Sequence, residues 1–164
     1  MKAIDLVRGA LEMTHRGTLA MVADMADAAM TRPTSAGGNH PLWVMGHLAF
    51  IEGAVPQVLL GEDHPVGHWA PLFAPGTEPM SDASAYPPFA EVVATYTRLR
   101  ERNLRLLNEL GDGAMDRVPP NPPPGMEDVM RTFGQTFQLI ALHQMVHYGQ
   151  IADARRVAGR KPLM

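Results

Sequence analysis

The sequence contains no cysteine among its 164 residues. This absence excludes disulfide bonds, thiolate nucleophiles, cysteine-ligated zinc and iron–sulfur clusters. Any metal ion would therefore be bound through nitrogen or oxygen atoms. The seven histidines are the first side chains to consider, because neutral imidazole is a common ligand for transition metals.

The sequence also lacks a large excess of charge of one sign. Its 14 Lys and Arg residues are set against 17 Asp and Glu residues, which gives a formal net charge of -3. Nucleic-acid-binding proteins carry clustered positive charge that this composition does not provide, so we expect no nucleic-acid partner. The N-terminal residues mix apolar and charged side chains and contain no signal-peptide hydrophobic run. We therefore expect a cytoplasmic protein.

One long stretch, residues 132–152, has no charged side chain and is long enough to cross a bilayer. Four glutamines and two histidines interrupt it. Polar side chains at this density are costly in lipid. We interpret the stretch as a buried helix and expect no membrane association.

The length of the chain fits one domain, residues 1–164. Apolar residues recur at helical spacing from Ile4 and predict a first helix over about residues 2–31, ended by the Arg32–Pro33 pair. A second helix is predicted from Pro41 to Gly61. Pro56 lies inside this pattern and is expected to kink the helix or end it early.

The second half of the chain predicts two more helices separated by irregular segments. Residues 62–86 are rich in proline and glycine and read as a long connection, after which residues 88–111 form an amphipathic helix with Arg100 and its charged neighbours toward solvent. Residues 118–125 are expected to be extended, and a last helix is predicted over about 126–158, with Gly159 near its end. The sequence thus predicts an all-α four-helix bundle with a long crossover between helices 2 and 3.

The last predicted helix places two imidazoles, His143 and His147, on one face, roughly 5–6 Å apart. Apolar residues share this face, which is expected to pack inward. Two buried imidazoles must satisfy four ring nitrogens, and a divalent metal ion would take one nitrogen from each ring. The spacing leaves open the alternative of two core histidines bonded to backbone or glutamine.

A third histidine, His47, lies in the second predicted helix among core residues. Sequence spacing alone does not bring it to the C-terminal pair. Three histidine ligands would leave open positions for water or substrate, as in catalytic zinc sites, whereas structural zinc usually has four protein ligands. A meeting of the three side chains would therefore favour a reactive site.

Three segments carry a resemblance to a known family. Trp43-Val-Met-Gly-His47-Leu-Ala, His143-Gln-Met-Val-His147-Tyr-Gly-Gln150-Ile and the following Arg155-Arg-Val-Ala-Gly159-Arg-Lys-Pro162 together resemble the DinB-like superfamily. The resemblance covers nearly the whole chain. It implies a four-helix bundle of up-down-down-up connectivity and a metal triad at the matching positions His47, His143 and His147.

Members of this family include metal-dependent hydrolases and enzymes that use low-molecular-weight thiols, such as bacillithiol transferases and mycothiol-dependent maleylpyruvate isomerases. The resemblance therefore implies a metalloenzyme whose divalent ion, zinc or nickel, activates a low-molecular-weight thiol for transfer to a small-molecule electrophile. Two alternatives stay open: a hydrolase that uses metal-bound water, and a non-catalytic metal-binding stress-response bundle. A homodimer is also expected, because such assemblies are common.

Two residues near the histidines have two interpretations each. Gln150 lies one turn beyond His147, where it could orient a ligand or form a helix–helix hydrogen bond. Trp43 lies one turn before His47, where it could wall the site or simply belong to the core. Glu52, the carboxylate nearest to His47 in sequence, is expected at the solvated surface. The remaining histidines are expected to have no ligand role: His15 as a core residue, and His40, His64 and His68 as surface residues.

Overall fold

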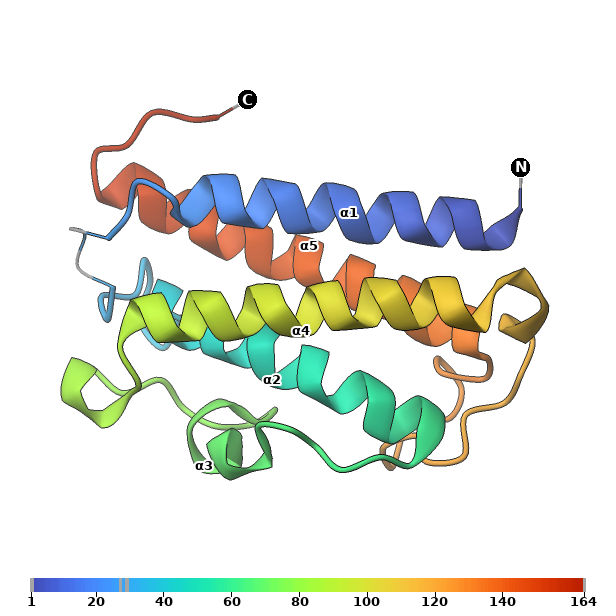
Figure 1. The fold of residues 1–164 in the computed structure, drawn as a ribbon. Helices are drawn as coiled ribbons and strands as arrows, with labels where there is room; N and C mark the ends of the chain where they lie inside the picture. Colours follow the sequence, from blue (N-terminus) through green and yellow to red (C-terminus); the bar gives the residue numbers. More distant parts are fainter. Residues whose placement is uncertain (1, 27, 29, 164) are drawn as a thin grey trace.

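The structure is a computed structural model that describes residues 2–26, 28 and 30–163. Four long helices run side by side (Figure 1): α1 (Ala3–Val22), α2 (Pro41–Leu60), α4 (Phe89–Leu110) and α5 (Phe133–Val157). The connections contain a single turn of α-helix, α3 (Ala70–Phe73), and three 3-10 turns, η1 (Gly67–Trp69), η2 (Ala83–Ala85) and η3 (Asp112–Ala114). No strand occurs in the described part of the chain. The prediction of an all-α four-helix bundle is confirmed.

The four helices have the up-down-down-up arrangement. Helices α1 and α5 run in one direction and helices α2 and α4 in the other (Figure 1). Helix α1 packs beside α5 and α2 beside α4, while contacts of α2 with α5 and of α1 with α4 close the ring. Residues 61–88 return the chain along the bundle from the end of α2 to the start of α4, and they carry α3, which packs on α2. This segment is the predicted long crossover.

Helix α2 continues through Pro56 to Leu60, so Pro56 does not end the helix early. Proline removes the amide that would bond to the carbonyl four residues earlier, which is that of Glu52. In the structure this carbonyl accepts a hydrogen bond from Nδ2 of Asn103 on α4, 2.9 Å away. The tertiary contact replaces the missing helical bond and allows the helix to continue.

The first helix is shorter than predicted. It ends at Val22 instead of near residue 31, although Met25 is buried in the same apolar cluster. The chain turns there, with the Met25 amide donating to the Val22 carbonyl at 3.1 Å. The apolar spacing thus continued into a turn that packs on the core, and helical periodicity alone cannot separate the two. Positions 27 and 29 of the predicted helix lie outside the described residues.

The last helix begins at Phe133 instead of near residue 126. Thr132 caps it, since its hydroxyl accepts a hydrogen bond from the Gln135 amide at 3.2 Å. The preceding residues form turns, and the Met130 side chain in this region is buried in the apolar core. A buried methionine in a turn extended the apolar pattern beyond the true helix start.

The interior has two apolar clusters, one in each half of the bundle, and a buried polar network between them. The network centres on Arg100, whose guanidinium pairs with the Glu52 carboxylate at 2.5 Å and donates to the Leu11 carbonyl at 2.8 Å. Both ionised side chains are fully buried, so the expectation that Arg100 and Glu52 face solvent is wrong. Hydrogen bonds join the other members to this pair: Thr14, Thr18, Tyr96, Asn103 and Gln144.

Helix α2 is also the one described helix that is long and apolar enough to cross a membrane by composition. Most of it is buried between α4 and α5. Its apolar character is accounted for by its place in the bundle core, because a helix that is hydrophobic on all sides is expected where all sides are covered.

Candidate metal centre

Helix α2 holds His47 in its second turn. His40 caps the start of the helix, since its Nδ1 accepts a hydrogen bond from the Trp43 amide at 3.1 Å, and Pro41 takes the first helical position. His47 is 4% exposed. Its Nδ1 lies 2.8 Å from the carbonyl oxygen of Phe73 in α3. Because a carbonyl only accepts, Nδ1 carries the proton and Nε2 presents a lone pair.

Helix α5 holds the other two imidazoles on one face. His147 is buried, and its Nδ1 donates to Oε1 of Gln150 at 2.8 Å. Its Nε2 therefore also presents a lone pair. His143 is half-buried and lies one turn earlier, and its Nδ1 is enclosed without a hydrogen-bond partner among the described residues.

The three rings converge at their Nε2 atoms. Nε2 of His143 lies 3.3 Å from that of His47 and 3.1 Å from that of His147. The candidate ligand atoms of all three lie within 4.8 Å of one another. A proton on Nε2 of His143 can form a good hydrogen bond to only one of the two neighbouring nitrogens, so the lone pair of the other nitrogen has no partner. A metal cation would accept a lone pair from each of the three rings.

The spacing of the nitrogens tests whether a metal ion fits. Zinc–nitrogen bonds of about 2.0–2.1 Å at a tetrahedral angle place two nitrogens about 3.3–3.4 Å apart. The separations of 3.1 and 3.3 Å around His143 are close to this value. Three neutral imidazoles are also a donor set that zinc and nickel both accept. The donor set thus suits a divalent transition metal, and the two separations that involve His143 match the geometry of such a site.

Burial keeps these imidazoles neutral. The pKa of His47 and of His143 is lowered to about 4, chiefly by loss of hydration. For His47 the hydrogen bond to Phe73 opposes this shift and His147 adds to it, while for His143 both neighbouring imidazoles add to it. Burial also lowers the pKa of His147, against the opposing effect of its hydrogen bond to Gln150. Neutral imidazole is the form that binds metal, so the cluster is ready for a ligand role at neutral pH.

The two neighbours singled out in the sequence both touch the cluster. Gln150 accepts the Nδ1 proton of His147 and also a longer, 3.4 Å bond from Nδ2 of Asn39. Trp43 is buried and stacks on His47 with ring centroids 4.7 Å apart and an 8° interplanar angle. Both side chains therefore fix the orientation of an imidazole, as partners outside the metal ligands do in known sites.

The crossover supplies contacts that sequence reasoning missed. Besides the Phe73 carbonyl, it provides the Thr77 hydroxyl, which accepts a 3.1 Å bond from Nε1 of Trp43. The close approach of Phe73 to α2 depends on Gly46, where an added Cβ would lie 2.1 Å from the Phe73 ring. Gly46, one residue before His47, is the feature of the sequence that could have indicated this close approach.

The other histidines lie apart from the cluster. His15 is half-buried with Nδ1 3.4 Å from the Tyr96 hydroxyl, and His68 is exposed. His64 packs on Phe50. His40 is buried at the start of α2, where Nε2 donates to the Met80 carbonyl at 2.9 Å, so its expected place at the surface is wrong.

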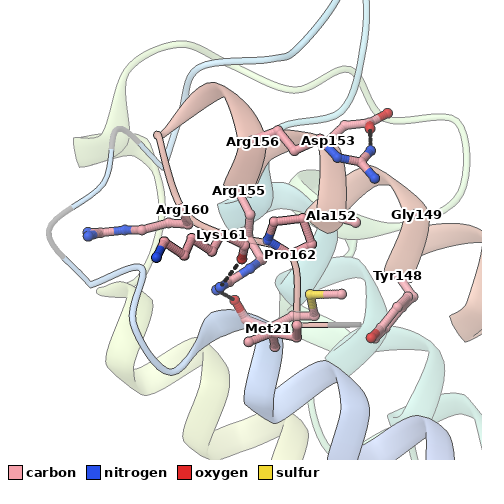
Figure 2. A pocket seen from close by; sticks show the side chains of 11 residues that line it. Met21, Tyr148, Gly149, Ala152, Asp153, Arg155, Arg156, Arg160, Lys161 and Pro162 are labelled. Atoms are coloured by element: carbon pink, nitrogen blue, oxygen red, sulfur yellow. Dashed lines mark hydrogen bonds and ion pairs between the residues drawn. The ribbon is translucent and has the colours of Figure 1, made fainter.

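A separate cavity of about 390 Å³ lies between α5, the end of α1 and the C-terminal tail (Figure 2). Its arginines have partners of their own: Arg155 pairs with Asp24, and Arg156 pairs with Asp153 at 2.8 Å. The three clustered histidines are not among its lining residues. Arg155 also donates to the Lys161 carbonyl at 3.2 Å and so links the segment after α1 to the C-terminal tail, and the cavity is distinct from the histidine cluster.

The fold and the site together place this protein among the helical bundles in which facing helices bring histidine side chains to one point. The chain belongs to the DinB superfamily, whose family model matches residues 10–151. Among solved structures it is similar to YfiT from Bacillus subtilis, with a TM-score of 0.65, 20% sequence identity, 96% of this chain covered and 89% of that chain. YfiT is described as "a probable metal-dependent hydrolase with an unusual four-helix bundle topology". No curated protein matches the chain.

Proposed function

We propose that this protein is a metal-dependent enzyme in which His47, His143 and His147 bind one divalent cation, zinc or nickel. The observation that carries the proposal is the convergence of three Nε2 atoms, two of which have their lone pairs directed inward by fixed Nδ1 protons. A divalent ion held there would act as a Lewis acid that stabilises the anionic form of a thiol or of water.

The residues around the cluster prepare it for this role. The Phe73 carbonyl and the Gln150 side chain hold the Nδ1 protons of His47 and His147, and this selects the tautomers in which Nε2 is free to ligate. Trp43 covers one face of His47. Since three protein ligands leave a position open, the centre suits a substrate better than a closed structural role.

The preferred nucleophile is a low-molecular-weight thiol, transferred to a small-molecule electrophile. The two helices that hold the cluster each carry one carboxylate: Glu52 on α2 is paired with Arg100 in the core, and Asp153 on α5 is paired with Arg156. Hydrolases such as the HExxH metalloproteases use a carboxylate as general base for water. A thiol has a pKa of about 8–9 and needs less assistance to lose its proton.

Hydrolysis is the second candidate, and the description of YfiT as a probable metal-dependent hydrolase favours it. In either case we propose a single-domain, cytoplasmic protein that acts on a small molecule, and a homodimer is the assembly to look for.

Metal analysis of untagged protein, followed by a conjugation assay, tests the proposal. We expect one divalent ion per chain and turnover of a generic electrophile such as 1-chloro-2,4-dinitrobenzene with a cellular thiol. His147→Ala should lose both the ion and the turnover, while His68→Ala, a change at an exposed histidine, should keep both. Turnover with water alone would instead identify a hydrolase. Bound metal with neither activity would support the non-catalytic bundle.

A further inference from the structure

The segments that frame the histidine cluster contain no ionised side chain. Residues 33–51, 64–77 and 132–152 have no Asp, Glu, Lys or Arg. These segments supply the three imidazoles and the side chains that orient them. On α2 the single ionised residue is Glu52, whose charge is compensated by Arg100 at 2.5 Å. A ligand at the cluster would therefore find no free charged group in the segments that surround it.

The solvent-facing side of the cluster is at His143. His47 and His147 are buried, whereas His143 is half-buried and is the member closest to solvent. On a helix, the residues one turn before and after His143 on the same face are Leu139 and Val146. Val146 is 65% exposed, and Leu139 is partly buried against the core. The approach along α5 is thus apolar.

These two observations limit the charge that a ligand can carry. Three neutral imidazoles do not offset the two positive charges of a divalent ion, so the centre favours one anionic donor atom. A second charge that lies against these segments would lose part of its hydration without gaining a charged partner there, which is unfavourable. An apolar group would gain from contact with the α5 surface.

This inference rests on the proposed metal site. We infer that the cluster selects a substrate that has a single anionic donor group, such as a thiolate, and an otherwise neutral, apolar body. Val146 is then a specificity-determining residue at the entrance to the site. A substrate with a further carboxylate or ammonium group is disfavoured.

Two thiols of similar size test the inference by binding alone. The protein is loaded with Co²⁺, and its visible absorption spectrum is followed during titration with butane-1-thiol or with 3-mercaptopropionate, which carries a carboxylate where the first has an alkyl end. The wild-type protein should bind butane-1-thiol at least about tenfold more tightly, because the carboxylate finds no partner.

Introducing a positive charge at the entrance should reverse part of this preference. Val146→Lys should tighten binding of 3-mercaptopropionate by about threefold or more, as expected for opposite charges several ångströms apart in a partly hydrated site. Val157→Lys is the matched control, since Val157 is 56% exposed on the same helix but lies three turns further on. It should leave both affinities unchanged.

The outcomes separate the two proposals. If the wild-type protein gives no cobalt spectrum that depends on the histidines, the metal site is wrong and the inference falls with it. If cobalt binds but both thiols bind equally well, or if Val146→Lys behaves like Val157→Lys, the metal site stands and the inference about its substrate is overturned.

Discussion

The buried ion pair between Arg100 and Glu52 should be one of the most sensitive points of the fold. Arg100→Met removes one partner and leaves the Glu52 carboxylate enclosed between α2 and α4, where both side chains are at most 1% exposed. Breaking such a pair on one side costs about 3–5 kcal/mol. For a chain of this size each kcal/mol corresponds to about 2–4 °C, so the midpoint of thermal unfolding should fall by about 6–20 °C.

The same two helices offer a matched control. Arg102 on α4 pairs with Glu62, just beyond α2, at the same 2.5 Å separation, but these side chains are 39% and 45% exposed. Exposed pairs contribute about 0–1 kcal/mol, so Arg102→Met should change the free energy of unfolding by no more than that. Urea denaturation followed by circular dichroism measures both variants.

A double variant guards against the case in which Arg100→Met does not fold. Glu52→Gln combined with Arg100→Met removes both charges and should be more stable than Arg100→Met alone, because no unpaired carboxylate remains. If Arg100→Met costs no more than Arg102→Met, the reasoning about burial is refuted. The same holds if the double variant is less stable than the single one.

Two further predictions concern the cluster and its support. The pKa of His47 and of His143 in the folded protein is about 4, whereas a histidine in the unfolded chain has a pKa of about 6.5. Between these two values the folded, metal-free protein binds fewer protons than the unfolded chain. Its free energy of unfolding should therefore fall as the pH is lowered through this window. Urea titrations near pH 7 and pH 5 measure this, and a free energy that rises toward acid would contradict it. Gly46→Ala should destabilise the fold by about 1–3 kcal/mol, because the new methyl group overlaps Phe73. Gly149→Ala, with open space around it, should stabilise α5 by about 0.5–1 kcal/mol, and equal effects of the two changes would show that the Gly46 contact is unimportant.

Local signals in the sequence predicted much of the bundle. The proline and glycine that bound α2, and the amphipathic pattern of α4, place these helices within one or two residues. The errors at the end of α1 and the start of α5 have one cause, which is that Met25 and Met130 are buried from turns. Apolar spacing reports burial, and burial is not confined to helices.

The histidine pair on α5 is likewise a local signal, since four-residue spacing fixes a common face. That His47 joins it depends on how α2 packs against α5, which no local pattern encodes. For that reason the convergence was expected only from resemblance to a family. The Phe73 carbonyl could not be foreseen at all, because backbone acceptors are the same at every residue and only the fold selects one.

The buried charges were missed for a related reason. Arg100 lies among charged residues on α4, and its sequence neighbourhood resembles a solvated face. Only the four-helix arrangement brings it within reach of Glu52 and Gln144. Partners on separate helices decide whether an ionised side chain can be buried, and the sequence of one helix does not contain that information.

X-ray absorption spectroscopy of zinc-loaded protein tests the metal centre most directly. The account predicts one zinc ion per chain with three imidazole nitrogens at about 2.0–2.1 Å, and loss of one imidazole from the spectrum, or of the ion itself, in each of His47→Ala, His143→Ala and His147→Ala. A zinc environment of oxygen ligands, or a spectrum unchanged by these three substitutions, would contradict it.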